Sequence, residues 1–154
     1  MPTDKKIQII KPLLSDSYLV IIKNSVDSKI WRRGYVLVNG KRTEIYRNGQ
    51  LSCAFFVSSI LRLFDLIDEV HATVAGTIKD LKKNRWQKVR KPSLGDILIW
   101  QEIEDRDGLK HAHIGFYIGG KQAISNSSRA RSPQKHHWTY NNKRNITAIY
   151  HRDM

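Results

Sequence analysis

The chain has 154 residues, 40% of them hydrophobic and 27% charged, which is typical of a globular protein and excludes an intrinsically disordered one. Its 27 basic side chains outnumber 14 acidic ones, and the net charge of +13 favours polyanionic partners such as nucleic acid, anionic lipid or anionic cell-wall polymer. The single cysteine excludes a disulfide bond within the chain.

The beginning of the chain shows no export signal. Residues 7–10 are mostly apolar, but Lys11 and Pro12 follow at once, so the run is too short for the apolar region of a signal peptide. No stretch approaches the ~18 apolar residues of a transmembrane segment. We therefore expect a protein that stays in the cytoplasm, or one exported by lysis, by a dedicated secretion system, or after losing a leader that is not part of this sequence.

Residues 7–45 are predicted to form β-structure. Residues 18–22 are a short apolar run, which we interpret as a strand. Residues 35–38 and 41–46 flank Asn39-Gly40, a pair that readily adopts a type I′ turn, so this segment is predicted to be a hairpin.

Two helices are predicted next. From Cys53, apolar side chains recur at helical spacing, which predicts a largely buried helix over residues 53–67 with Ser52 as its N-cap. A second, amphipathic helix is predicted over residues 73–84. The apolar side chains that we expect to face inward are Phe56, Val57, Ile60, Leu61 and Phe64 in the first helix, and Val74, Ile78 and Leu81 in the second.

The rest of the chain is predicted to be mostly antiparallel strands. An apolar strand covers residues 97–100, and an acidic loop leads to a strand over residues 113–118 that returns toward Asn126. Residues 127–137 are interpreted as an exposed basic loop, and residues 146–150 as a last strand. The order of strands, helices and antiparallel strands indicates the α+β class.

Cys53 is the candidate nucleophile. A free cysteine is often only a buried apolar side chain, but this one opens a helix, whose N-terminus carries a partial positive charge. That charge and an imidazolium at His113 would lower the pKa of the thiol below its usual ~8.5. The backbone N–H of Cys53, and more weakly the Gln50 amide, are candidate donors to an oxyanion.

Hairpin geometry suggests a partner for His113. If Gly119-Gly120 is a two-residue turn, His113 lies directly opposite Asn126, whose amide oxygen can accept the imidazole N–H and orient the ring. A one-residue bulge would bring Ser125 or Ser127 to that place instead. The predicted catalytic residues are therefore Cys53, His113 and Asn126.

Two other interpretations of the histidines are weaker. His111, His113 and the pair His136-His137 lack the close ligand spacings of zinc sites, so no metal ion and no cofactor are expected. A His-Asn-His nuclease site would have to use His136 or His137 with Asn145 and His151, and its spacing is compressed. The tryptophans are expected in the core or in the walls of a groove: Trp31, Trp86, Trp100 and Trp138.

Three blocks resemble the NlpC-type cell-wall endopeptidases of the papain-like cysteine peptidase superfamily. They are the helix start at Cys53, the Pro-x-x-Gly-Asp block of residues 92–97, and residues 113–119, which read His-Ile-Gly-Phe-Tyr-Ile-Gly. The resemblance covers about residues 46–127. It implies that Cys53 is the nucleophile and His113 the base, and equal-length alignment brings Ser125 to the third polar position. The family often has Asp-Cys-Ser-Gly where this chain has Ser-Cys-Ala-Phe.

The resemblance implies a single papain-like domain over residues 1–154, with a β-rich N-terminal part (1–45) and a catalytic core (46–154) whose nucleophile helix packs on an antiparallel sheet. The expected activity is that of a cysteine peptidase or amidase that cleaves peptide stems of peptidoglycan. One alternative is a non-catalytic basic module that binds nucleic acid or anionic cell-wall polymer on the same fold. Another is an acyltransferase or transglutaminase-like enzyme with the same triad. The oligomeric state stays open.

Overall fold

The computed structural model describes residues 7–154, which form a mixed α+β fold with antiparallel strands, as the sequence predicts. The N-terminal signal prediction falls partly on residues 1–6, which lie outside the described residues. Within the described part, no helix has the length and apolar character needed to cross a bilayer. The elements are α1 (Leu14–Asn24), β1 (Tyr35–Val38), β2 (Lys41–Glu44), the 3-10 helix η1 (Arg47–Gly49), α2 (Cys53–Leu63), α3 (Val74–Lys83), β3 (Gln87–Lys88), β4 (Ile97–Glu104), β5 (Lys110–Gly119), β6 (Gln122–Ser127), β7 (Ser132–His137) and β8 (Ile146–His151).

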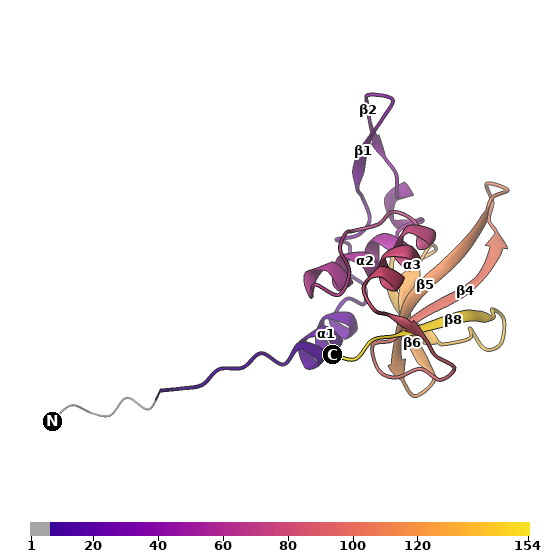
Figure 1. The fold of residues 1–154 in the computed structure, drawn as a ribbon. Coiled ribbons are helices and arrows are strands. Elements are labelled where there is room, and N and C mark those ends of the chain that lie inside the picture. The colour runs from indigo at the N-terminus through magenta and orange to yellow at the C-terminus, as the bar shows by residue number, and fades with distance from the viewer. Residues whose placement is uncertain (1–6) are drawn as a thin grey trace.

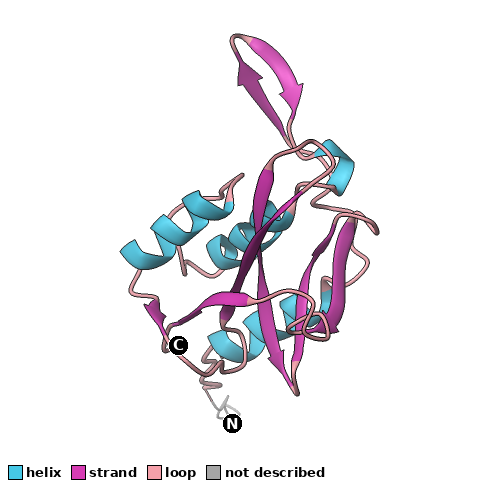
Figure 2. Ribbon diagram, turned by 90° about the vertical axis from the view of Figure 1, so that its right-hand side faces the viewer, coloured by secondary structure: helices cyan, strands magenta, loops and turns pink. Residues whose placement is uncertain are grey.

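The main sheet has six strands in the order β3-β8-β4-β5-β6-β7, all neighbours antiparallel. Figure 1 shows the helices gathered beside this sheet, and the β1–β2 hairpin projecting away from it. In Figure 2 the strands cross in front of the helices, so the sheet and the helices form two layers.

Strand alternation gives each face of the sheet its own apolar cluster. Ile99, Ile114 and Phe116 point to the helix side, where Phe116 packs edge-to-face against Phe56 of α2 with ring centroids 5.4 Å apart. Leu98 and Trp100 point to the other side, where loop side chains such as Trp138 cover them. His113 pairs with Trp100 across β4 and β5, so it belongs to this second face.

The predicted β-structure of residues 7–45 is wrong for residues 18–22, which lie in α1. Tyr18 and Ile22, four residues apart, are both buried against the core, and the Tyr18 hydroxyl donates to the Gly95 carbonyl at 2.8 Å. A short apolar run does not distinguish a strand from a buried helix, and here helical spacing decided the outcome.

The predicted hairpin is confirmed as β1 and β2. Asn39 and Gly40 have φ of 49° and 77°, the left-handed conformations that a type I′ turn requires. Its four β1 side chains are all exposed, so the hairpin lies outside the main core.

The two predicted helices are confirmed as α2 and α3, but α2 ends at Leu63 rather than at residue 67. Asp65 has φ of 53°, which is incompatible with continuing the helix. The predicted basic loop over residues 127–137 is wrong in its second half, because Ser132–His137 forms β7 and pairs with β6. Three of the four tryptophans are buried as expected, namely Trp31, Trp86 and Trp100.

Candidate active site

Cys53 is the first residue of α2 and is partly exposed. Ser52 occupies the N-cap position, as predicted, but its side chain makes no capping bond, and its buried Oγ has no hydrogen-bond partner among residues 7–154. The Ser52 carbonyl instead accepts the first bond of the helix from Phe56 N at 2.8 Å. The N–H groups in the first turn of α2 are therefore available to the Cys53 sulfur and to a bound ligand.

The sulfur of Cys53 lies where β5 and β6 separate. Their pairing stops at Gly115 and Ser125, although β5 continues back to Lys110 alongside β4. The N–H of Ile114 consequently has no partner on β6, and it interacts with the Cys53 sulfur instead. This contact brings the thiol to the backbone next to His113, although no hydrogen bond within residues 7–154 joins the sulfur to the His113 ring.

Ser125, rather than Asn126, contacts His113. Nε2 of His113 lies 2.8 Å from Ser125 Oγ, whereas Asn126 Nδ2 donates to the Gly49 carbonyl at 2.8 Å on the other face of the sheet. The predicted pairing of His113 with Asn126 is therefore wrong, and of the two alternatives the structure selects Ser125. Ser127 Oγ accepts from the Ala130 N–H in the following turn.

A β-bulge in β5 explains why the predicted pairing of His113 with Asn126 is wrong. The two residues of the turn are Gly120 and Lys121, both with φ near 60°, and not Gly119-Gly120. The register shifts between Tyr117 and Gly119, so Ile118 is one extra residue on β5. Because side chains alternate along a strand, a slip of one residue moves Asn126 to the opposite face and brings Ser125 to the His113 face.

The hydrogen bonds of Ser125 fix the tautomer of His113. Nδ1 of His136 lies 2.8 Å from the His137 carbonyl, which can only accept, so the proton of a neutral His136 is on Nδ1. Its Nε2, 2.7 Å from Ser125 Oγ, must then accept the single hydroxyl proton of Ser125. Ser125 Oγ therefore accepts from Nε2–H of His113 and from the Tyr140 hydroxyl at 3.0 Å. This arrangement leaves the lone pair of His113 Nδ1 free to act as a base.

Burial determines the protonation states of Cys53 and His113. It raises the pKa of the Cys53 thiol, and this effect outweighs the backbone N–H groups of Ala54 and Ile114 and the charge of Arg144. The predicted lowering of the thiol pKa by the helix N-terminus is therefore not what the structure shows. Burial, together with the positive charge of Arg144 and with His136, lowers the pKa of His113 to about 3. The resting site holds a neutral thiol and a neutral imidazole.

Three residues of the site were not predicted in this role: His136 of β7, Tyr140 and Arg144. Tyr140 and Arg144 lie between β7 and β8, in a turn where Tyr140, Asn141 and Asn142 have φ between 52° and 64°. Such a conformation is uncommon for a bulky side chain, and it places the Tyr140 ring 4.0 Å from the His136 ring, centroid to centroid, in a stacked pair. The only sequence signal for this turn is the Asn141-Asn142 pair, because asparagine tolerates left-handed backbone.

The remaining candidates lie apart from this cluster. Gln50 is exposed, and its side-chain amide makes no hydrogen bond within residues 7–154. His111 groups with Asp105 and Asp107 in the β4–β5 turn, where their ligand atoms lie within 4.8 Å of one another. Asp107 is already paired with Arg47 at 3.1 Å and with His111 at 3.3 Å. The hydrogen bonds of Asp107 to Arg47 and His111 therefore account for this group.

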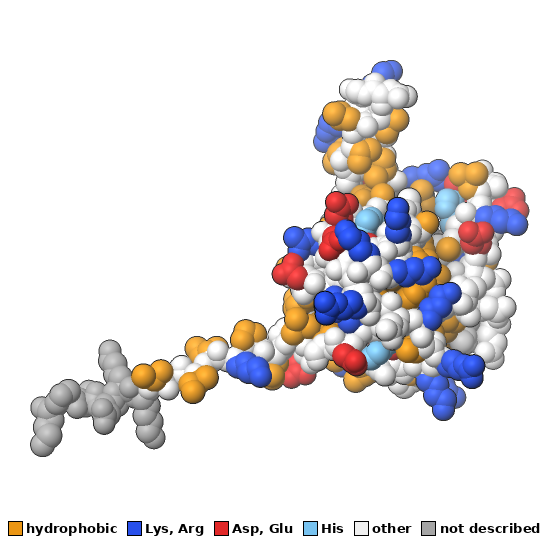
Figure 3. Space-filling view, in the orientation of Figure 1, with side chains coloured by type: hydrophobic (Ala, Val, Ile, Leu, Met, Phe, Trp, Pro, Cys, Tyr) orange, Lys and Arg blue, Asp and Glu red, His pale blue; other side chains and the backbone are white. Residues whose placement is uncertain are grey.

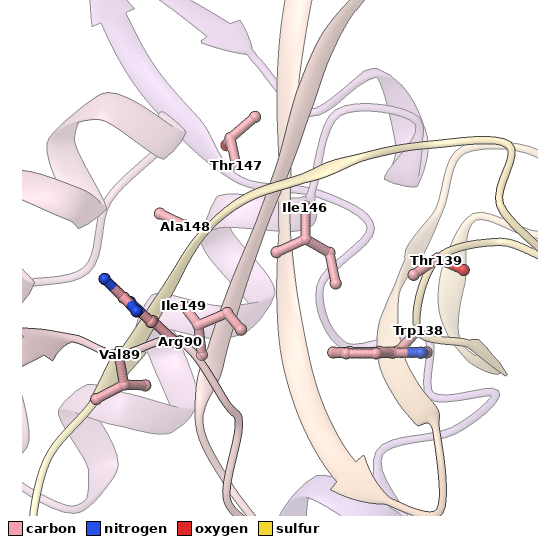
Figure 4. Close-up of a pocket in the computed structure, with 8 residues that line it drawn as sticks. All are labelled: Val89, Arg90, Trp138, Thr139, Ile146, Thr147, Ala148 and Ile149. Carbon is pink, nitrogen blue, oxygen red and sulfur yellow. The ribbon is translucent and has the colours of Figure 1, made fainter.

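An open pocket of about 330 Å³ lies on the same side of the sheet as Trp138. Figure 4 shows β8 running across it, with Val89 and Arg90 on one side and Trp138 and Thr139 on the other. Its remaining lining is Ile146–Ile149 of β8. Cys53 is not among the lining residues, although Thr139 is the neighbour of Tyr140 along the chain.

No protein-family model matches this chain, and no curated protein resembles it significantly.

Proposed function

We propose that this protein is a cysteine hydrolase in which Cys53 attacks a peptide or amide carbonyl and His113 is the general base. The observation that carries the proposal is the hydrogen bond of His113 Nε2 to Ser125 Oγ at 2.8 Å, with the Cys53 thiol near the N–H of Ile114, the next residue of β5. Ser125 itself is a poor candidate for the nucleophile, because it is 1% exposed and already has three partners. The papain-like fold and the NlpC-type resemblance belong to this proposal.

The protonation state defines the first step. As the sulfur attacks the carbonyl carbon, the thiol proton moves to Nδ1 of His113, whose Nε2–H stays bonded to Ser125. The carbonyl oxygen becomes an oxyanion near the backbone N–H of Cys53. The C–N bond then breaks, the proton passes from Nδ1 to the departing amine, and a thioester remains. Water activated by His113 cleaves the thioester and returns the thiol.

The proposed substrate is a stem peptide of peptidoglycan. The support is the NlpC-type spacing of Cys53, Gly95-Asp96 and His113, together with the net charge of +13, which favours an anionic wall. The test is incubation of the purified protein with muropeptides, with new amino termini identified by mass spectrometry. We expect cleavage by the wild type and none by Cys53→Ala, while Ser59→Ala on the same helix keeps the activity. Cleavage that survives in Cys53→Ala would refute the proposal.

A second candidate function is polyanion binding, favoured by the basic segment formed by residues 79–91. Figure 3 shows blue side chains spread over the face of the molecule around α3. The one acidic side chain within the segment, Asp80, is buried and paired with His71 at 2.6 Å, and from outside the segment Asp68 pairs with Lys83. We expect binding that weakens steeply with salt and persists in Cys53→Ala. The exposed basic residues of the segment are Lys79, Lys82, Lys83, Arg85, Lys88, Arg90 and Lys91.

A further inference from the structure

Arg144 carries a positive charge into the candidate active site, and no carboxylate of residues 7–154 pairs with it. It is partly buried and lies two residues before β8. Its Nε and Nη2 donate to the Gln101 carbonyl at 3.1 and 3.0 Å, and Nη2 also donates to the His111 carbonyl at 3.1 Å. Both acceptors are neutral, and none of the salt bridges within residues 7–154 includes Arg144.

These hydrogen bonds fix where the guanidinium lies. Gln101 follows Trp100, the residue that pairs with His113, and His111 precedes His113 by two residues on β5. Arg144 therefore bridges β4 and β5 at the irregularity between Trp100 and Ile103, next to the cross-strand pair of Trp100 and His113. The charge is close enough to act on the pKa of Cys53, His113 and Tyr140.

The bonding pattern also leaves donors unused. A guanidinium has five N–H donors, and the three hydrogen bonds of Arg144 come from Nε and Nη2. Nη1 makes no hydrogen bond to residues 7–154. A partly buried charge is usually paired, because its desolvation is otherwise unfavourable, and arginine binds carboxylates with a fixed, planar set of donors. A negatively charged ligand would supply the missing partner.

We propose that Arg144 is an anion-binding residue of the candidate active site, where it holds a carboxylate of the substrate next to the bond that Cys53 attacks. The assignment of the anion to a substrate rests on the proposed function; the binding of an anion beside the thiol does not. The substrate class is therefore an acyl compound or peptide with a free carboxylate near the scissile carbonyl. The same peptide with that carboxylate amidated would be a poorer substrate.

The single cysteine allows a test that needs no known substrate. Cys53 is alkylated with iodoacetate, which is an anion, and with iodoacetamide, which is neutral and similar in shape, at one pH and ionic strength. In Arg144→Gln we expect the ratio of the iodoacetate to the iodoacetamide rate to fall about tenfold, since the charge next to the thiol is lost. Arg129→Gln, an exposed residue with the same change in net charge, should keep the wild-type ratio. An equal fall in both variants, or in neither, would overturn the proposal.

Two further measurements cover the case in which Arg144→Gln fails to fold. Arg144→Lys keeps the charge and should retain most of the ratio. In the wild type, acetate should protect Cys53 from iodoacetamide more than acetamide does, at constant ionic strength, and equal protection would contradict anion binding.

Cleavage of muropeptides separates this proposal from the proposed function. If Arg144→Gln loses cleavage of the carboxylate substrate and of the amidated substrate to the same degree, the carboxylate role of Arg144 is rejected, whereas the proposed hydrolase activity is not. Absence of cleavage by the wild type would instead reject the proposed function.

Discussion

The ring of His113 and the hydroxyl of Ser125 lie 2.8 Å apart, although the two residues are not directly opposed in the sheet. Ser125 pairs with Gly115, and His113 is the next residue of β5 on the same face. Gly115 leaves the path between them open, because a Cβ at that position would lie 2.7 Å from the Ser125 Cβ. The imidazole is thus oriented by a diagonal neighbour across a glycine.

Replacement of Ser125 tests this arrangement. Ser125→Ala removes the acceptor for Nε2–H of His113, so we expect kcat of the proposed hydrolysis to fall about ten- to hundredfold while KM changes little. The matched control is Ser127→Ala on the same strand, where the lost bond is to the Ala130 N–H. The measurement is steady-state kinetics on the best muropeptide. Equal kcat in Ser125→Ala and Ser127→Ala would show that Ser125 does not position the base.

The reactivity of the thiol should depend on Arg144 more than on His113. Burial raises the pKa of Cys53, so alkylation by iodoacetamide should keep rising with pH beyond the ordinary ~8.5 of a free thiol. Arg144→Gln should move the midpoint higher, because a positive charge that favours the thiolate is lost. His113 is neutral throughout this pH range, so His113→Asn should move the midpoint little. A wild-type midpoint below 8, rising in His113→Asn, would indicate a thiolate–imidazolium pair instead.

Burial of neutral His113 should also make the fold sensitive to acid. The folded-state pKa is about 3 against an ordinary value of 6.5, so between these values the unfolded chain binds a proton that the folded chain does not. The free energy of unfolding should therefore fall as pH decreases from 6.5, by at most about 1.4 kcal/mol per pH unit for this one group.

Urea titrations between pH 7 and pH 4 measure this dependence. His113→Gln has no titrating group at the position, so its free energy of unfolding should decrease less steeply as the pH falls. The difference in slope should correspond to the uptake of about one proton fewer on unfolding. The same slope in the variant and in the wild type would show that His113 is not held neutral in the fold.

The sequence predicted the parts of this site whose signals are local. The helix that begins at Cys53 follows from apolar spacing, and the hairpin that carries His113 follows from alternation and glycines. The pairing of His113 with Asn126 was wrong because it depends on a bulge at Ile118, which leaves no trace in the pattern of apolar residues. A shift of one residue in register places Ser125 rather than Asn126 on the face of His113, so a hydroxyl rather than an amide contacts the base.

The residues that came from distant segments could not be predicted. His136 lies on a strand interpreted as a loop, because Ser132–His137 lacks the apolar alternation of a typical strand. Tyr140 and Arg144 reach the site only because a turn with three consecutive left-handed residues folds back over β4 and β5. Contacts between segments so far apart depend on the tertiary fold, and no local periodicity encodes them.

Gly95 offers a last test, at the junction of α1 with the sheet. Its φ is +85°, its carbonyl accepts from the Tyr18 hydroxyl at 2.8 Å, and an added Cβ would lie 2.7 Å from Tyr18 Cε1. Gly95→Ala should therefore lower the free energy of unfolding by about 3 kcal/mol, from backbone strain and steric overlap together.

The chain offers a matched control for this substitution. Gly108 has φ of +74°, and no atom of residues 7–154 lies within 4 Å of an added Cβ, so Gly108→Ala should cost only about 1 kcal/mol, from the backbone alone. Chemical denaturation of both variants gives the difference. If both substitutions lower the free energy of unfolding by the same amount, the cost at Gly95 comes from its backbone conformation alone. The close approach of Tyr18 to Gly95 then does not contribute to stability.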